Sequence, residues 1–66
     1  MMKIKINGQW REVEASTIQA LLEELGLSRR LLVIEHNLEI IEPQAYEQTV
    51  LAEGDQIEIV HFVGGG

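Results

Sequence analysis

Residues 2–26, MKIKINGQWREVEASTIQALLEELG, decide the fold of this chain. Residues 2–6 alternate between apolar and charged side chains, which is the period of a β-strand with one buried face. Asn7 and Gly8 follow, and because both residue types tolerate a positive φ, this pair is the strongest short signal for a β-hairpin. A second strand is expected over residues 9–14. The chain therefore begins with a hairpin.

The register of this hairpin has two solutions in the sequence. A two-residue turn pairs Ile4 with Arg11, which puts Arg11 on the core face and Trp10 on the outside. A β-bulge or a longer loop would remove that conflict by shifting the second strand. The sequence alone favours neither solution.

A helix is expected after the hairpin, because apolar residues then recur at the spacing of one helical stripe: Ile18, Leu21, Leu22 and Leu25. Either Ser16 or Thr17 caps its start, and Ser16 with Gln19 has the form of a capping box. Gly26 occupies the place of a left-handed C-terminal cap. A helix of about nine residues is too short to persist alone, so it must pack on a sheet.

The second half of the chain contains further strand and turn signals. In order, we expect a strand over residues 31–35, a turn at 36–38, a short strand over 39–41, one helical turn within 44–48, a turn at 53–55, and a last strand from 56 to about 63. A strand that follows a crossover helix usually lies parallel to an earlier strand. This order predicts an α+β fold, a β-grasp (ubiquitin-like) mixed sheet with one helix packed across one face. The domain is expected over residues 1–63, with a flexible glycine tail at 64–66.

Composition excludes several protein classes. A chain of 66 residues makes one domain. The absence of cysteine excludes a disulfide scaffold, a cysteine-ligated zinc site and a thiol nucleophile, and it fits a reducing compartment. The longest run of large aliphatic residues is the four at positions 31–34, whereas a bilayer span needs about 20. The alternating N-terminus does not have the pattern of a signal peptide. We therefore expect a cytoplasmic protein with no membrane attachment.

The net charge of −6 is unevenly distributed. All five Lys and Arg residues lie in the first 30 positions, whereas residues 31–66 contain seven acidic residues and no basic one. This half opposes nucleic-acid binding, whose affinity comes from basic residues that neutralise phosphates, so no nucleic-acid partner is expected. The charge favours a basic protein partner. The simpler alternative is a solvated acidic surface that keeps a small domain soluble.

The sequence contains no recognisable catalytic or metal-binding pattern. His36 and His61 do not have the spacing of metal ligands. Ser16 and Ser28 do not lie in the turn that presents a serine nucleophile. One sheet with one helix also offers little concavity for a catalytic pocket. We therefore expect no catalytic residue, no metal and no bound cofactor.

The last three residues are all glycine, which is half of the glycines in the chain. One interpretation is a frayed terminus, since chain ends tolerate disorder. The other is a functional tail: without Cβ atoms it can be threaded through a narrow channel, and three extended residues reach about 10 Å. The terminal carboxylate is ionised at neutral pH and is therefore a poor electrophile, so it needs activation by another enzyme. Adenylation with ATP would supply the leaving group.

Several stretches of the chain together resemble the ThiS family, the ubiquitin-like sulfur carriers of bacterial thiamine biosynthesis. The resemblance extends over essentially the whole chain, and it rests on Asn7-Gly8, Thr17-Ile18 with Leu21-Leu22, Val33-x-Glu35-x-Asn37, Gly54-Asp55-x-Ile57-Glu58-Ile59-Val60, and Phe62-Val63-Gly64-Gly65-Gly66. Two positions depart from the pattern expected of close members. Leu38 stands where a glycine is common, and Glu42-Pro43 stands where Pro-Arg is common.

The resemblance implies a chemistry at Gly66. An E1-like adenylating enzyme of the ThiF type would adenylate this glycine with ATP. Sulfur that comes from cysteine through a desulfurase would then convert it to a thiocarboxylate. The thiocarboxylate would donate its sulfur to the thiazole precursor on a thiazole synthase of the ThiG type. Gly65 corresponds to the first glycine of the family's terminal pair, and Gly64 belongs to the tail only.

Val60 and Phe62 alternate with Ile57 and Ile59 along the last expected strand. If the strand is regular, Val60 and Phe62 lie on the face away from the helix and, with Val63, form a docking surface beside the tail. If the strand bulges, Phe62 caps the core instead. Other function classes also fit such a chain: a sibling sulfur carrier for molybdopterin synthesis, a protein-tagging modifier, or a ubiquitin-like interaction module that does not use its glycines.

Overall fold

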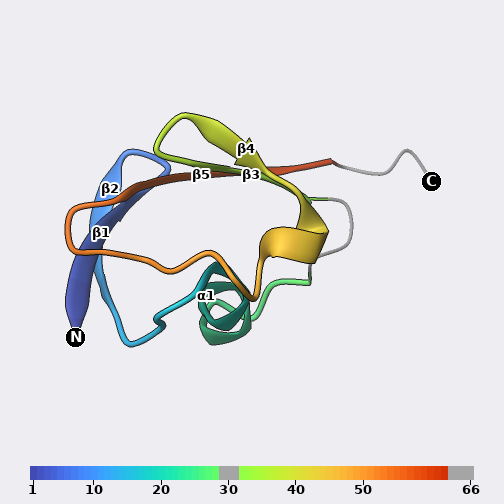
Figure 1. Cartoon of the computed structure of the whole chain (residues 1–66). Helices are drawn as coiled ribbons and strands as arrows, with labels where there is room; N and C mark the ends of the chain where they lie inside the picture. Colours follow the sequence, from blue (N-terminus) through green and yellow to red (C-terminus); the bar gives the residue numbers. More distant parts are fainter. Residues whose placement is uncertain (29–31, 63–66) are drawn as a thin grey trace.

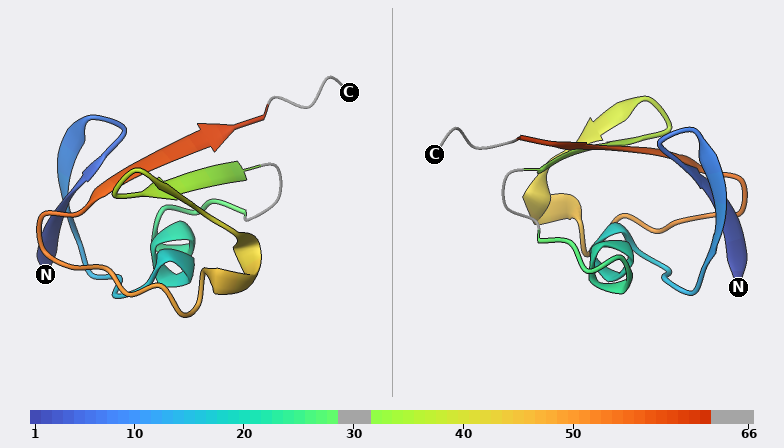
Figure 2. Two further views of the ribbon diagram at one scale, coloured as in Figure 1. Left: turned by 45° about the horizontal axis from the view of Figure 1, so that its top comes forward. Right: turned by 180° about the vertical axis from the view of Figure 1, so that it is seen from behind.

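The computed structural model describes residues 1–28 and 32–62. Its elements are β1 (Met2–Ile6), β2 (Gln9–Val13), α1 (Ile18–Glu24), β3 (Leu32–His36), β4 (Glu39–Ile41), the 3-10 helix η1 (Pro43–Ala45) and β5 (Gln56–His61). The strands form one five-stranded sheet in the order β2-β1-β5-β3-β4. Helix α1 lies across one face of this sheet, as Figures 1 and 2 show. The expected β-grasp architecture is confirmed.

The sheet is mixed because two neighbouring strands, β1 and β5, run in the same direction. β1 pairs with β5 in parallel, and every other neighbouring pair is antiparallel. The last strand was expected to reach about residue 63, but β5 ends at His61. Val63 and the glycine tail at 64–66 lie outside the described residues, so the domain boundary between 63 and 64 stays a prediction.

The first hairpin uses the two-residue turn. Asn7 and Gly8 have φ values of 48° and 84°, and Ile4 pairs directly with Arg11. The bulge or longer loop is therefore the wrong solution. An inward-facing arginine is tolerated because β2 is an edge strand, and four of its five residues are exposed to solvent.

Helix α1 is shorter than the apolar stripe indicates, with seven residues instead of about nine. Thr17 is its N-cap, and the Thr17 hydroxyl accepts the Ala20 N–H at 3.1 Å. The capping box of Ser16 with Gln19 is therefore wrong, because the helix begins one residue later than that motif requires. The left-handed Gly26 is confirmed, with φ of 72°.

The core lies between α1 and the sheet. The sheet and α1 contribute most of its buried side chains, and the other segments contribute Ala15, Tyr46 and Leu51: Ile4, Ile6, Val13, Ala15, Ile18, Leu21, Leu22, Leu32, Ile34, Tyr46, Leu51, Ile57 and Ile59. The helical stripe and the inward face of the last strand are thus as the sequence predicts. Tyr46 follows η1 and is fully buried, which the sequence reading did not anticipate.

A polar cluster fixes the start of β5. Asp55 accepts the Ala52 N–H at 2.9 Å and hydrogen-bonds His36 Nε2 at 2.7 Å, and the Asn37 amide donates to it at 3.2 Å. Burial by itself would raise the pKa of Asp55. The hydrogen bonds from His36, Ala52 and Asn37, with the charge of His36, outweigh that effect and hold the pKa below its ordinary value of 3.8. The cluster ties the turn before β5 to the turn between β3 and β4.

Candidate functional site

The last residues of β5 show which side chains face away from the core. Ile57 and Ile59 are buried, whereas Val60 and the following Phe62 are 50% and 55% exposed. By alternation with the buried Ile57 and Ile59, they lie on the opposite side of the sheet from the core. Helix α1 covers the core side (Figure 2), and we call the other side the open face. Regular alternation is confirmed, and the alternative in which Phe62 caps the core is wrong. Val63, the third residue of the expected docking surface, lies outside the described residues.

The open face around β5 combines apolar and acidic side chains. Val33 is paired with Val60, and Glu35 is paired directly with Glu58. On the other side of Glu35 lies Ile40, which is 68% exposed. Like charges directly opposite each other are unfavourable in a sheet, so this arrangement is not optimised for the isolated domain.

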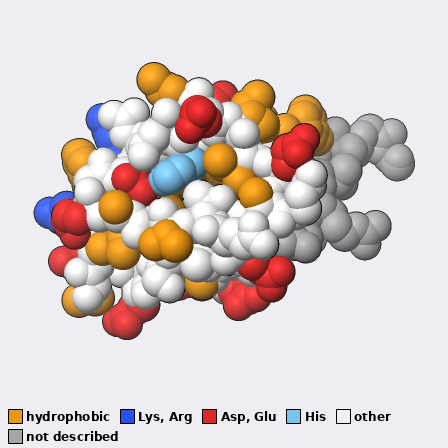
Figure 3. All heavy atoms as spheres, in the orientation of Figure 1, with side chains coloured by type: hydrophobic (Ala, Val, Ile, Leu, Met, Phe, Trp, Pro, Cys, Tyr) orange, Lys and Arg blue, Asp and Glu red, His pale blue; other side chains and the backbone are white. Residues whose placement is uncertain are grey.

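Within residues 1–28 and 32–62, the basic side chains are Lys3, Lys5 and Arg11, all in the hairpin of β1 and β2. On the face that Figure 3 shows, the coloured Lys and Arg side chains lie at the end where β1 and β2 lie, and acidic side chains are spread over the whole face, that end included. In the hairpin, the Lys5 ammonium lies over the Trp10 ring, 5.8 Å from its centroid. Among the residues that the structure describes, the basic side chains therefore all belong to the hairpin.

The side chain of Asn7 continues the pairing of β5 beyond the end of β1. β1 pairs with β5 only through Lys5–Gln56 and Ile6–Ile57. Beyond Ile6, the Asn7 side-chain amide replaces the backbone of β1 as the hydrogen-bond partner of β5. Its Oδ1 accepts the Ile59 N–H at 2.7 Å, and its Nδ2 donates to the Ile59 carbonyl at 3.2 Å. The sequence indicates a turn at Asn7, but it contains no sign of a partner 52 positions away.

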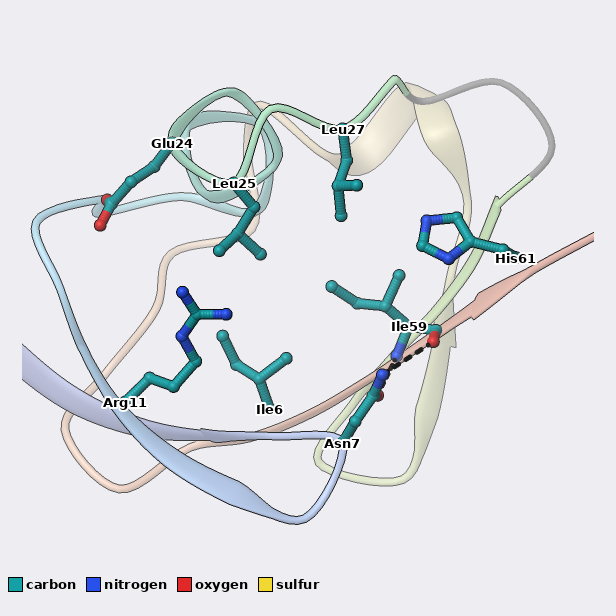
Figure 4. Close-up of a pocket in the computed structure, with 8 residues that line it drawn as sticks. All are labelled: Ile6, Asn7, Arg11, Glu24, Leu25, Leu27, Ile59 and His61. Atoms are coloured by element: carbon teal, nitrogen blue, oxygen red, sulfur yellow. Dashed lines mark hydrogen bonds between the residues drawn. The ribbon is translucent and has the colours of Figure 1, made fainter.

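A pocket of about 310 Å³ lies between the hairpin, the end of α1 and the inner face of β5 (Figure 4). Its lining combines four aliphatic side chains with four polar or charged ones: Ile6, Leu25, Leu27, Ile59, Asn7, Arg11, Glu24 and His61. The Glu24 carboxylate accepts the backbone N–H groups of Glu14 and Ala15, at 3.0 and 2.8 Å. The sequence alone does not predict this pocket, because its walls come from four elements, β1, β2, α1 and β5.

The two histidines are in different surroundings. His36 belongs to the cluster around Asp55, and His61 lines the pocket. Within residues 1–28 and 32–62, no three His, Asp or Glu side chains come together as a metal site. In the same part of the chain, no helix is long and apolar enough to cross a membrane. Gly64, Gly65 and Gly66 lie outside the described residues, so modification of Gly66 stays a prediction.

Comparison with known sequences identifies relatives over almost the whole chain. The sequence model of the ThiS family matches residues 4–66. The sulfur carrier protein ThiS of Bacillus subtilis is 41% identical over 66 residues, which cover 96% of this chain and 98% of that protein. A thiazole synthase of Paramagnetospirillum magneticum is 48% identical over 66 residues, which cover 98% of this chain but 20% of that protein. This chain thus spans about a fifth of the length of that thiazole synthase.

Comparison with solved structures agrees. The crystal structure of the thiamine biosynthesis protein ThiS from Geobacter metallireducens superposes with a TM-score of 0.83 and 29% sequence identity. The superposition covers 98% of this chain and 100% of the Geobacter chain. The similarity therefore includes both fold and sequence.

Proposed function

Because this chain belongs to the ThiS family of sulfur carriers in thiamine biosynthesis, we propose that it carries sulfur as a thiocarboxylate on Gly66. The observation that supports this most directly is the extent of the family match, which runs to residue 66 and so includes all three terminal glycines. The proposed role is that of a protein substrate of other enzymes. The chain is not itself proposed to be a catalyst.

The proposed chemistry has three steps at the Gly66 carboxyl group: adenylation, transfer of sulfur and reductive release. The Gly66 carboxylate attacks the α-phosphate of ATP on a ThiF-type adenylating enzyme, which gives an acyl adenylate and releases pyrophosphate. A persulfide that a desulfurase forms from cysteine then displaces AMP and gives an acyl disulfide. A second thiol, such as excess cysteine, reduces its S–S bond, which releases the thiocarboxylate and leaves a disulfide. ATP is consumed by the partner enzyme, and no cofactor is proposed to bind this chain. Gly65 and Gly64 give the approaching enzymes access to the backbone because they lack Cβ atoms.

A thiazole synthase of the ThiG type is the proposed acceptor of the sulfur. Two thiazole synthases, from Paramagnetospirillum magneticum and Magnetococcus marinus, each contain a stretch similar to 98% of this chain. A carrier and a synthase in one polypeptide support the proposal that the separate proteins act together. We place this exchange in the cytoplasm, with neither nucleic acid nor membrane as a partner.

The open face at the end of β5 is the proposed docking surface for these partners. Val60 and Phe62 are half exposed and lie just before the tail, and Val63, the next residue of the chain, is proposed to belong to the same surface. Exposed apolar side chains that the fold does not need are typical of binding sites. The neighbouring Glu35 and Glu58 favour a basic rim on the partner.

The test is the intact mass of the protein after incubation with a ThiF-type enzyme, ATP and a cysteine desulfurase with cysteine. The expected gain equals the replacement of one oxygen by one sulfur, localised to Gly66. The control is the chain without Gly66, which is expected to fold normally and to gain nothing. Lysine-linked conjugates would instead indicate a tagging protein, and no change would indicate an interaction module. Delivery of sulfur to a thiazole precursor, and not to molybdopterin, distinguishes the two kinds of carrier.

A further inference from the structure

One edge of β5 is unpaired near its C-terminal end. β1 turns away after Ile6, so the described residues after Ile59 have a strand neighbour only on the β3 side. The Ile59 N–H and carbonyl point to the β1 side, where the Asn7 amide receives them. In an antiparallel ladder, alternate residues present their backbone groups to the same side. The His61 N–H and carbonyl therefore face the place that a longer β1 would occupy.

The pocket lies beneath this vacant strand position. In Figure 4, Ile59 and His61 border it along β5, and Arg11 rises from β2 on the opposite side. Leu25 and Leu27 close it from the end of α1. A side chain on the inner face of an added strand would point into this space. A volume of about 310 Å³ is small for a cofactor but suits one large apolar side chain.

Arg11 gives this site a charge preference. Glu24 is engaged by two backbone N–H groups, and within residues 1–28 and 32–62 the Arg11 guanidinium has no ion pair. It is also a cation in a chain of net charge −6. An unpaired guanidinium at the wall of an apolar pocket is suited to a carboxylate, which it can bind with two parallel hydrogen bonds.

We propose that this edge of β5 accepts an extended segment of a partner protein as an added strand. The segment bonds to the backbone of His61, places one large aliphatic or aromatic side chain in the pocket, and directs a neighbouring Asp or Glu at Arg11. Strand addition of this kind takes affinity from the backbone and specificity from the pocket. The site is distinct from the open face, because it uses the other side and the free edge of the same strand. This added-strand proposal depends on the proposed function only because that function decides which partner enzymes are tested.

The first test is amide hydrogen exchange, at single-residue resolution, of the full chain alone and with a ThiF-type enzyme or a ThiG-type synthase. We expect exchange at His61 to slow by at least about tenfold with one of these partners. The Glu12 amide is the matched control, because the pairing of β2 leaves its N–H on the outer edge of the sheet, and its exchange is expected to stay unchanged. If a complex forms and exchange at His61 does not slow with either partner, the proposal is wrong and the carrier function stands. If neither enzyme binds the chain, both the added-strand proposal and the proposed carrier function are wrong.

The second test separates the backbone from the side chains. His61→Pro removes the free N–H and is expected to weaken binding of the responding partner by about tenfold. His61→Ala keeps the N–H and alters only one wall of the pocket, so it is expected to weaken binding less. Arg11→Ala is expected to have an effect of similar size, and Lys3→Ala, in the same hairpin but on the open face, almost none. Arg11→Lys is the second variant if Arg11→Ala does not fold, and it is expected to restore part of the affinity. Equal binding by Arg11→Ala, Lys3→Ala and the unchanged protein would refute the carboxylate contact.

Discussion

The side chain of Asn7 is expected to stabilise the fold more than its place in a turn suggests, and Asn7→Gly tests this. The change removes two hydrogen bonds to Ile59, of 2.7 and 3.2 Å, but it leaves a residue that tolerates the φ of 48°. A hydrogen bond contributes about 0.5–1.5 kcal/mol net, so we expect a loss of about 1–3 kcal/mol. In a domain of this size each kcal/mol moves Tm by about 4–8 °C.

Leu38→Gly is the matched control for this substitution. Leu38 also has a positive φ, of 73°, but its side chain is 83% exposed. The same change to glycine there relieves backbone strain and removes little packing, so the protein is expected to be unchanged or up to about 1 kcal/mol more stable. The difference between the two variants isolates the contribution of the Asn7 amide.

Urea unfolding followed by circular dichroism measures both variants, and the m-value shows whether the unfolded states remain comparable. Asn7→Asp adds a third comparison, because it keeps the acceptor for the Ile59 N–H and loses the donor to the Ile59 carbonyl. It is expected to be destabilised as well. If Asn7→Gly has the stability of the unchanged protein to within about 0.5 kcal/mol, water replaces both bonds without cost and the reasoning is refuted.

Three further predictions concern the open face and the cluster at Asp55. Phe62→Ala is expected to weaken binding of the ThiF-type enzyme with little change in Tm, while Leu38→Ala, at a more exposed apolar residue in the turn between β3 and β4, leaves binding unchanged; a large fall in Tm with the same Kd would contradict this. Glu58→Lys replaces a like-charge pair with Glu35 by an opposite-charge pair and is expected to raise the free energy of unfolding by about 0.5 kcal/mol at low salt, an effect that salt should reduce. Because the pKa of Asp55 is lowered in the folded state, its contribution is present above pH 3.8 and is lost as the pH falls through the folded value; Asp55→Asn should remove this acid-dependent loss, and an identical acid unfolding curve would contradict it.

Local patterns were sufficient for most of the fold. The alternation in β1, the Asn7-Gly8 turn and the left-handed Gly26 depend on neighbours in the sequence, and the structure contains all three. The start of the helix was harder to predict, because Ser16 and Thr17 are both good N-caps and their side chains do not decide which residue adopts the extended conformation.

Contacts between segments far apart in the sequence could not be predicted from the sequence alone. The direction of Arg11 depends on how far α1 covers the hairpin, and α1 is short enough to leave β2 exposed. The second role of Asn7 and the pocket beside His61 depend on segments that meet only in the folded chain. The exposure of Phe62 followed from alternation once the strand was known to be regular.

Two turn asparagines hold β5 from opposite sides. Asn7 Oδ1 accepts the Ile59 N–H, and Asn37 Oδ1 accepts the Gln56 N–H at 2.9 Å. A strand that slides by two residues keeps the same side chains inward, so the hydrophobic core alone resists such a shift weakly. The two asparagines oppose such a shift, because a sliding β5 would break both of these hydrogen bonds at the same time. A pull on the chain beyond His61 would therefore be resisted by both hairpins, and β5 would keep its position along the sheet.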